Sequence, residues 1–217
     1  MDNELIKRIL SSIILIPMAL FFIIEGSIFF IFFILSCFLI AIYEWHTISK
    51  KKLYFFLGLV FLIFSFYSIY NLRNEFDGDY LYLLFVTTIC ISTDIGGYVF
   101  GKTFKGPKLT KISPKKTYAG MIGSFFLSVI SIIFFLDNPY LYRSLEFSNK
   151  MVIFVILVSI VSQLGDIFIS YFKRKSKIKN TGNIIPGHGG FLDRVDGMLF
   201  AFPFSYILLT LGFINFF

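Results

Sequence analysis

The sequence is poor in charged residues. Asp, Glu, Lys and Arg make up only 15% of its 217 residues, whereas 57% are hydrophobic and 31 are Phe. A soluble domain carries about 25% charged and about 45–50% apolar residues, so this composition excludes an ordinary soluble domain. We predict an all-α, polytopic membrane protein that forms one membrane domain over residues 1–217.

Cysteine and histidine are scarce as well. The two cysteines, Cys37 and Cys90, lie singly inside apolar runs, which argues against a disulfide framework and favours buried thiols. No cysteine or second histidine lies near His188, so no zinc site is predicted. His188 is either a structural hydrogen bonder, an interfacial side chain or part of a binding site. The P-loop pattern and the Rossmann glycine fingerprint are also absent.

Seven apolar runs of roughly 17–22 residues follow along the chain, each long enough to cross about 30 Å of hydrocarbon. They fall at 5–24, 27–43, 53–71, 80–100, 117–136, 151–171 and 195–216. No small-residue cleavage site follows the first run, which predicts an uncleaved span rather than a signal peptide. The break at Glu25-Gly26 is either a hairpin or a polar interruption in one bent segment. We expect a hairpin, because 39 continuous residues are too long for one span.

The basic residues predict the orientation of these spans, because cytoplasmic loops are rich in Lys and Arg. With the N-terminus in the cytoplasm, 17 of the 20 Lys and Arg residues fall on the cytoplasmic side. They are Lys7, Arg8, Lys50 to Lys52, six residues in 101–116 and six in 172–194. The remaining three basic residues, Arg73, Arg143 and Lys150, fall on the outside. We therefore expect a cytoplasmic N-terminus, an outside C-terminus and no need for a nucleic-acid partner.

The loop at 101–120 holds more lysine than orientation requires. Gly106, Pro107 and Pro114 argue against one continuous helix through it. Its last part, residues 113–117, supplies Ser113, Lys115, Lys116 and Thr117 just before the fifth span. Ammonium groups and a hydroxyl near a helix N-terminus can cradle a phosphate. Contact with anionic lipid headgroups explains these lysines equally well.

Carboxylates near the membrane are a sharper signal, because an ionisable group at membrane depth is costly and points to function. Asp94, Asp166, Asp193 and Asp196 belong to three different spans, and we expect all of them in the cytoplasmic third of the membrane. Glu44 is predicted at the same level, where it is either part of this group or only an interfacial anchor beside Trp45.

The spacing of these residues adds detail. Asp166, Ser170 and Lys173 share one helix face, and so do Asp193 and Asp196, from which Arg194 turns away. Asp193 is either a simple helix cap or one of several acids that hold a hard cation such as Mg²⁺.

A glycine-rich stretch, residues 186–190, lies between these two helices and lets a ligand approach the backbone closely. Paired acids, many phosphate-seeking cations and such a stretch indicate phosphoryl or nucleotidyl transfer onto a lipid, chemistry that depends on positioning and charge neutralisation.

These residues resemble the long signature of the phosphatidate cytidylyltransferases, also called CDP-diglyceride synthetases. The matching positions are Ser170, Lys173, Arg174, Lys179, Gly182, Ile185, Pro186, His188, Gly189, Gly190, Asp193, Arg194 and Asp196. Further matches are Ser113 to Thr117, Gln163, Gly165, Asp166, Thr93, Asp94, Tyr98, Gly101 and Lys102. A weak match extends from Lys7 to Pro17. The resemblance therefore covers essentially the whole chain. Two positions depart, because the family usually has Asp at position 180 and Glu at position 119, where this chain has Asn180 and Ala119.

The resemblance implies that CTP and phosphatidic acid react to give CDP-diacylglycerol and pyrophosphate with Mg²⁺; whether a monovalent cation accompanies Mg²⁺ is left open. It assigns Asp166, Asp193 and Asp196 to the metal, and these acids with Lys173 and Arg194 to catalysis. It assigns substrate binding to Ser113, Lys115, Lys116, Thr117, Ser170, Arg174, Lys179, His188, Gly189, Gly190 and Asp94. Ser205 is a weaker candidate to line the site. Residues 1–100 would then be scaffold, and 101–217 would carry most of the site.

Two other functions stay open on the sequence. A CTP-dependent polyprenol or lipid kinase would use similar groups but transfer the γ-phosphoryl. An anion or lipid transporter is disfavoured, because such folds contain internal repeats and none is visible here. The abundant Phe, Ile, Lys and Asn suggest an AT-rich genome. We expect the protein in a bacterial inner membrane, with the site facing the cytoplasm, and leave a homodimer open.

Overall fold

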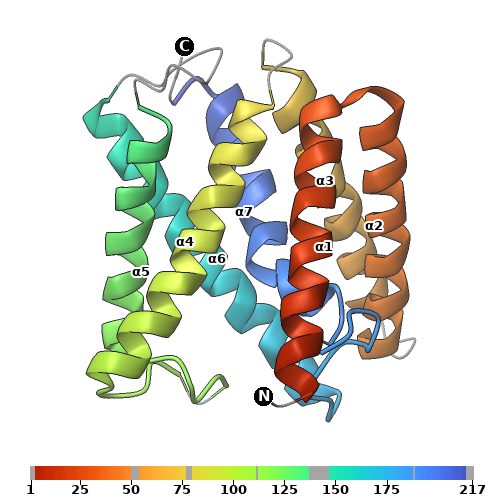
Figure 1. Ribbon diagram of the computed structural model, residues 1–217, viewed down its shortest axis with the longest axis vertical. Helices are drawn as coiled ribbons and strands as arrows, with labels where there is room; N and C mark the ends of the chain where they lie inside the picture. The colour runs from red at the N-terminus through yellow and green to blue at the C-terminus, as the bar shows by residue number, and fades with distance from the viewer. Residues whose placement is uncertain are drawn as a thin grey trace. The chain divides into compact units, whose positions relative to one another are not determined.

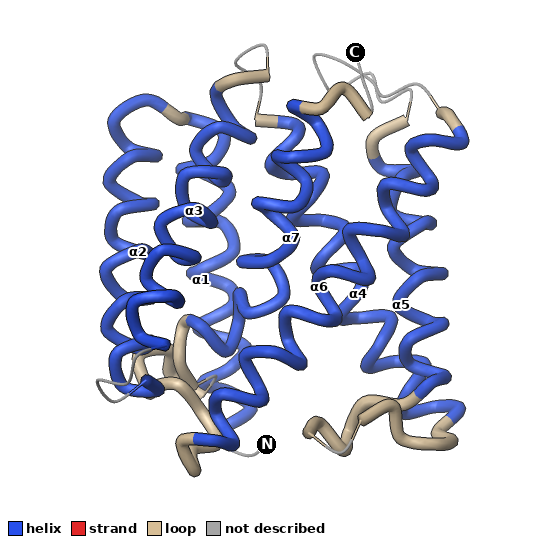
Figure 2. The backbone as a smooth tube through the Cα atoms, turned by 180° about the vertical axis from the view of Figure 1, so that it is seen from behind, coloured by secondary structure: helices blue, strands red, loops and turns tan. Residues whose placement is uncertain are grey.

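The computed structural model describes residues 3–49, 54–76, 80–110, 112–136, 147–187 and 189–213. The regular elements in these ranges are helices, as predicted from the composition. They are α1 (Asn3–Glu25), α2 (Ser27–Ser49), α3 (Tyr54–Asn74), α4 (Leu81–Phe104), α5 (Tyr118–Ile130), the 3₁₀-helix η1 (Ser131–Phe134), α6 (Asn149–Lys175) and α7 (Leu192–Thr210). Each predicted apolar run thus corresponds to one α-helix (Figures 1 and 2).

Four of these helices, α2, α3, α4 and α6, are long and apolar enough to cross a membrane, judged by length and composition. Leu10–Glu25 and Tyr118–Phe134 are shorter apolar helical stretches. An integral membrane protein is therefore supported, while the count of seven spans and the orientation of the termini stay predictions. Several residues used for that orientation, Lys50 to Lys52, Lys111 and Arg143, lie outside the described residues.

The chain divides into two compact units. The first unit comprises Met1–Leu81 and Tyr171–Asp196, and the second comprises Tyr82–Ser170 and Gly197–Phe217. Two helices contribute to both units: α6 passes from the second unit to the first, and α7 passes from the first to the second.

In the first unit, α1, α2 and α3 lie side by side (Figures 1 and 2). The break between α1 and α2 is a hairpin, as expected, with Gly26 at a φ of 70°. Arg73 of α3 completes it by donating to the carbonyls of Ile23 (3.0 Å) and Ile24 (3.2 Å). A Cβ atom on Gly26 would lie only 1.8 Å from this guanidinium, and the positive φ by itself already favours glycine at this position. The guanidinium also lies over the ring of Phe30, 5.4 Å from its centroid.

The C-terminal end of α2 packs against the part of α6 that belongs to the first unit. The Trp45 ring meets the Phe172 ring edge to face, with centroids 5.3 Å apart. One turn further on, the Ile48 carbonyl accepts a hydrogen bond from the Ser176 hydroxyl. These contacts fix the end of α6 and the start of the loop that follows it.

In the second unit, α4 and α5 approach closely through small residues. A Cβ atom on Gly96 would lie 2.4 Å from the Gly123 carbonyl oxygen, and one on Gly120 would lie 2.7 Å from the Gly97 carbonyl oxygen. Glycine therefore allows the two backbones to touch, as small residues do between membrane helices.

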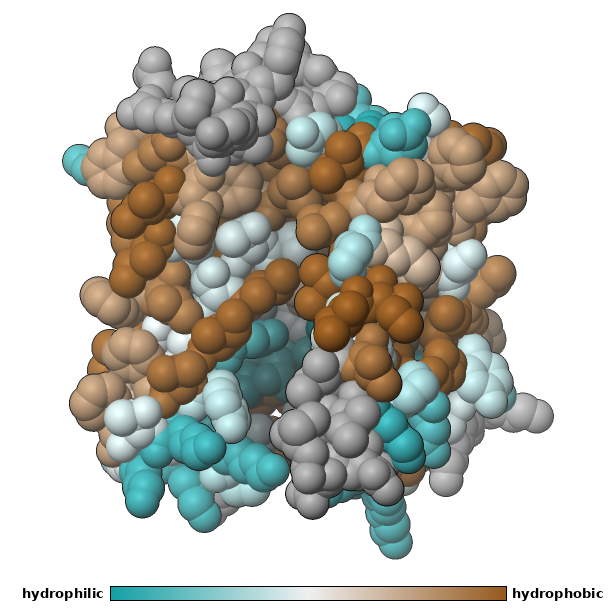
Figure 3. All heavy atoms as spheres, in the orientation of Figure 1, coloured by the Kyte–Doolittle hydropathy of each residue, from teal (hydrophilic) through white to brown (hydrophobic). Residues whose placement is uncertain are grey.

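The connection from α4 to α5 is not helical over its described residues, as Gly106 and the two prolines predicted. It folds back on itself, with Leu109 donating to the Lys116 carbonyl (2.8 Å). Hydrophilic side chains gather over this loop at the lower left of Figure 3, where Lys105, Lys108 and Lys115 are exposed.

Apolar side chains dominate the described surface of the helices in both units, as the brown areas of Figure 3 show. A lipid environment would cover such a surface, whereas water would not. Cys37 and Cys90 are both free thiols, which confirms that no disulfide joins them.

Candidate active site

In the first unit, a buried lysine joins the two acids at the start of α7. The Lys173 ammonium lies 2.8 Å from one carboxylate oxygen of Asp193 and 3.9 Å from one of Asp196. The side chains of Lys173 and Asp193 are only 9% and 8% exposed. Because both acids face the same ammonium, the prediction that Asp193 and Asp196 share one helix face is confirmed.

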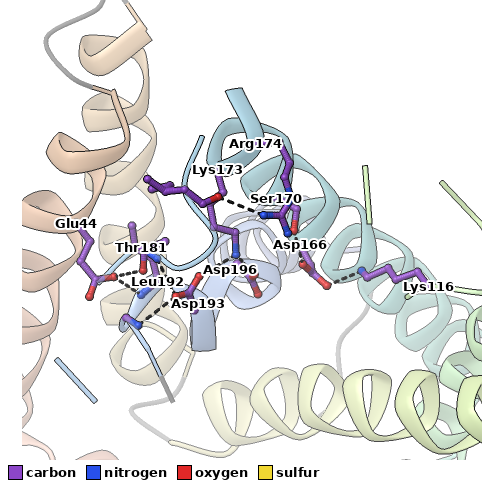
Figure 4. A network of polar contacts seen from close by, with 12 residues as sticks. Glu44, Lys116, Asp166, Ser170, Lys173, Arg174, Thr181, Leu192, Asp193 and Asp196 are labelled. Carbon is purple, nitrogen blue, oxygen red and sulfur yellow. Dashed lines mark hydrogen bonds and ion pairs between the residues drawn. The ribbon is translucent and has the colours of Figure 1, made fainter. Parts of the chain in front are cut away.

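The other oxygen of Asp193 accepts two backbone hydrogen bonds, from the Thr181 amide at 2.8 Å and the Gly190 amide at 3.1 Å (Figure 4). Asp193 lies in the first turn of α7, but the two amides that it accepts lie outside that helix, so its contacts are those of the centre of a charged cluster and not of a simple helix cap.

The residues between α6 and α7 that surround this acid, 181–191, are called the glycine loop below. A tight turn within it is closed by two hydrogen bonds between Ile185 and Gly189, of 3.0 and 3.2 Å. Gly187 and Gly189 adopt φ angles of 74° and 93°, which explains why glycine is needed at both positions. His188 lies outside the described residues.

Glu44 of α2 also contacts the glycine loop, although it precedes Thr181 by 137 residues in the sequence. Its carboxylate is fully buried and accepts the Thr181 hydroxyl (2.6 Å) and the amides of Phe191 and Leu192 (both 2.8 Å). Such burial rules out the alternative of an exposed interfacial anchor. Figure 4 shows Glu44, Thr181 and Asp193 as successive members of one polar network.

A second lysine–aspartate pair lies in the second unit. The Lys116 ammonium is 2.6 Å from one Asp166 oxygen and donates to the Gln163 carbonyl at 3.2 Å. The Ser170 hydroxyl donates to the other Asp166 oxygen at 3.3 Å, which confirms that Asp166 and Ser170 share a helix face. The pair is more open than Lys173–Asp193, with side chains 23% and 28% exposed.

The remaining predicted site residues fall into three groups. Lys115, Arg174, Lys179, Arg194 and Asp94 are exposed. Ser113 and Thr117 flank the turn before α5, where the Thr117 hydroxyl accepts the Gly120 amide and caps the helix. Gly189 and Gly190 line the glycine loop beside Asp193. The weaker candidate Ser205 is fully buried in the second unit, with a hydroxyl that has no hydrogen-bond partner.

The donor chemistry of these acids fits Mg²⁺, which is bound through one or two carboxylates together with substrate phosphates. A carboxylate oxygen has two acceptor sites. Within the described residues, the Asp193 oxygen that meets Lys173 accepts that one hydrogen bond, which leaves its second acceptor site for a ligand. Over the described residues, no group of three His, Cys, Asp or Glu side chains could hold a metal alone. The set of Asp166, Asp193 and Asp196 as metal ligands stays a prediction.

Glu44 and Thr181 are the two members of the cluster that the sequence did not assign to the site. Thr181 carries no charge, and its role depends on contacts 12 and 137 residues away. The one available signal was a lone carboxylate at the end of an apolar run, which needs several donors when it is buried.

Known proteins resemble this chain over most of its length. Residues 53–212 match the model of the Cytidylyltransferase family. The phosphatidate cytidylyltransferase of Rickettsia bellii (strain RML369-C) is 35% identical over 213 residues, 95% of this chain and 91% of that protein. The phosphatidate cytidylyltransferase of Bacillus subtilis (strain 168) is 34% identical over 161 residues, 71% of this chain and 57% of that protein. The phosphatidate cytidylyltransferase of Staphylococcus aureus (strain COL) is 35% identical over 178 residues, 76% of this chain and 64% of that protein.

Proposed function

The chain belongs to the Cytidylyltransferase family, and on that premise we propose that it transfers the cytidylyl group of CTP to phosphatidic acid. The products are CDP-diacylglycerol and pyrophosphate. The observation that carries the proposal is the relative named phosphatidate cytidylyltransferase that is 35% identical over 95% of this chain.

In this reaction an oxygen of the phosphatidate phosphate attacks the α-phosphorus of CTP. A phosphorus–oxygen bond forms there, and the bond from the α-phosphorus to pyrophosphate breaks. The nucleophile is already an anion and needs no strong general base. The protein therefore contributes positioning and neutralisation of negative charge.

The two lysine–aspartate pairs supply these contributions. The Lys173 ammonium lies between the carboxylates of Asp193 and Asp196, which hold this positive charge in one position. Lys116 is more exposed and can turn from Asp166 to a substrate phosphate. The exposed cations Arg174, Lys179 and Arg194 would neutralise the triphosphate and the departing pyrophosphate. Mg²⁺, when bound, supplies further charge neutralisation on the phosphates; Asp166, Asp193 and Asp196 would hold it.

We place the protein in a bacterial inner membrane with seven spans, a cytoplasmic N-terminus and an outside C-terminus. The 17 of 20 basic residues on the predicted cytoplasmic side support this topology, and so do seven helices at the seven apolar runs. The site then opens to cytoplasmic CTP, while the acyl chains of phosphatidic acid remain in the bilayer.

The test uses purified protein in detergent with phosphatidic acid and CTP labelled at the α-phosphate, with and without Mg²⁺. The expected result is label in the lipid phase, release of pyrophosphate and a requirement for Mg²⁺. Label that stays in water as CDP, with lipid labelled only from γ-labelled CTP, would replace the proposal with a lipid kinase. No turnover of CTP with any lipid would return attention to a transporter.

A further inference from the structure

Glu44 makes contacts that the proposed reaction does not by itself explain. It lies on α2, within the half of the chain predicted to be scaffold, and its carboxylate has no exposed surface. Its donors among the described residues are the Thr181 hydroxyl and the amides of Phe191 and Leu192, all of them neutral. A buried carboxylate that lacks a cation costs free energy, so a gain elsewhere has to offset it.

The contacts lead from Glu44 directly to the charged cluster. The hydroxyl of Thr181 donates to Glu44, while the amide of the same residue donates to Asp193 at 2.8 Å. Asp193 in turn meets the Lys173 ammonium at 2.8 Å. One residue of the glycine loop therefore joins the α2 carboxylate to the acid–lysine pair, and Figure 4 shows this sequence of contacts.

Glu44 also meets the N-terminus of α7, the helix that carries both Asp193 and Asp196. The two amides that it accepts belong to the first residue of this helix, Leu192, and to the residue before it. These amides have no partner within a helix, and a carboxylate there also interacts favourably with the helix dipole. Glu44 thus sets where α7 begins.

The glycine loop wraps this carboxylate so closely that two positions have no room for a side chain. A Cβ atom on Gly182 would lie 2.8 Å from one Glu44 oxygen. A Cβ atom on Gly190 would lie 1.9 Å from the Thr181 hydroxyl and 2.6 Å from the other Glu44 oxygen. The buried acid thus explains why both positions are glycine, and neither of them has a positive φ.

We propose that Glu44 is the positioning residue of the site, which fixes the glycine loop and the start of α7 so that Asp193 and Lys173 keep one geometry. It touches no reacting atom and acts through Thr181. The role requires a carboxylate, because both oxygens accept hydrogen bonds, and glutamine would turn an NH₂ group toward one set of donors. The inference rests on the proposed function for its effect on turnover, but not for its effect on the loop.

The first experiment measures amide hydrogen exchange in the purified full-length protein for peptides that cover the glycine loop and the start of α7. In Glu44→Gln we expect exchange at Phe191 and Leu192 to be about tenfold faster, because the loss of one buried hydrogen bond costs about 1–1.5 kcal/mol. The matched control is Ser68→Ala, which removes an equally buried polar group of the first unit that bonds only within α3. In this control variant, the amides of the glycine loop should exchange at the same rate as in the protein without a substitution.

The second experiment measures cytidylyl transfer by the same proteins. Loss of a side chain that orients a functional group typically costs about 10- to 100-fold. We expect that fall in kcat for Glu44→Gln, with the KM for CTP changed by less than about threefold, because the exposed cations that bind CTP are unaffected. Thr181→Val should reproduce the fall, and Thr181→Ser, which keeps the hydroxyl, should restore turnover.

The combined outcomes separate the two proposals. Faster exchange with a reduced kcat supports the positioning role. Unchanged exchange, or faster exchange with unchanged kcat, overturns it. If the unchanged protein shows no cytidylyl transfer, the proposed function fails, and the exchange rates still decide whether Glu44 fixes the loop. Should Glu44→Gln not fold, the pair Thr181→Val and Thr181→Ser gives the same decision.

Discussion

The two lysine–aspartate pairs differ in how firmly the protein holds them. Lys173 and Asp193 of the first unit are almost fully buried, and Asp193 accepts two backbone amides besides its lysine. Lys116 and Asp166 of the second unit are 23% and 28% exposed, and their further contacts are one hydroxyl and one carbonyl.

This difference indicates a division of roles. A buried pair loses much when one partner is removed, because the other charge stays in a medium of low polarity without compensation. An exposed pair contributes little to stability and exchanges its partner readily. The first pair is therefore suited to hold a geometry, and the second is suited to release its lysine to an incoming phosphate.

The largest expected effect is on turnover when the centre of the buried cluster is removed. Asp193→Ala should lower kcat/KM for CTP by about 10³-fold, because the proposed metal ligand and the partner of Lys173 are lost together, a cost of about 4 kcal/mol in the transition state. Transfer of α-labelled CTP into lipid by the purified variant measures this. Normal turnover would exclude Asp193 from the metal site.

The second prediction concerns stability and contrasts the pairs directly. Lys173→Met leaves Asp193 buried beside an apolar chain and should destabilise the protein by about 3–5 kcal/mol. Lys116→Met should cost no more than about 1 kcal/mol, because water still reaches Asp166. Thermal unfolding of both variants in one detergent gives the comparison. Equal shifts in melting temperature would contradict the division of roles.

The third prediction concerns turnover at the open pair. Lys116→Met should reduce kcat/KM by about 10- to 100-fold, the loss expected for one charge-assisted hydrogen bond to a phosphate of about 1.5–3 kcal/mol. Lys105→Met is the matched control, since Lys105 is an exposed lysine of the same loop without an assigned role. If both variants lose activity equally, the loop contributes only general positive charge.

The smallest expected effect is at Ser170, which belongs to the open pair through its bond to Asp166. Ser170→Ala removes one hydrogen bond to the Asp166 carboxylate, which is long at 3.3 Å and contributes about 1 kcal/mol, and should lower kcat/KM about fivefold. Titration of Mg²⁺ in the same assay shows whether the half-saturating concentration rises, as expected if Asp166 is a ligand. A loss as large as that of Asp193→Ala would instead give Ser170 a direct role.

The helices could be predicted because the length and hydrophobicity of each apolar run are visible in the sequence without any knowledge of tertiary contacts. The break at Gly26 was visible as a glycine beside a charge, and the loop between α4 and α5 as a glycine and two prolines. The sequence did not reveal that Arg73 closes the hairpin at Gly26. Arg73 was counted only as a basic residue outside the membrane, and its hydrogen bonds to Ile23 and Ile24 join residues some fifty positions apart.

The site was predictable where its residues share a helix. Regular helical spacing placed Asp166 with Ser170, and Asp193 with Asp196. It could not reveal the bond from Lys116 to Asp166 or the three contacts of Glu44, because these join elements far apart in the sequence. Glu44 was ambiguous for a physical reason: a carboxylate at the end of an apolar helix suits either water or a set of buried donors, and only the fold supplies the donors.

The arginine at the first hairpin has a consequence for the order of assembly. The carbonyls of Ile23 and Ile24 can receive the Arg73 side chain only when α3 lies beside them, so α1 and α2 alone cannot complete their turn. Closure of that turn requires the third helix. The carboxylate of Glu44, at the end of α2, depends on a still later segment, because Thr181 follows it by 137 residues.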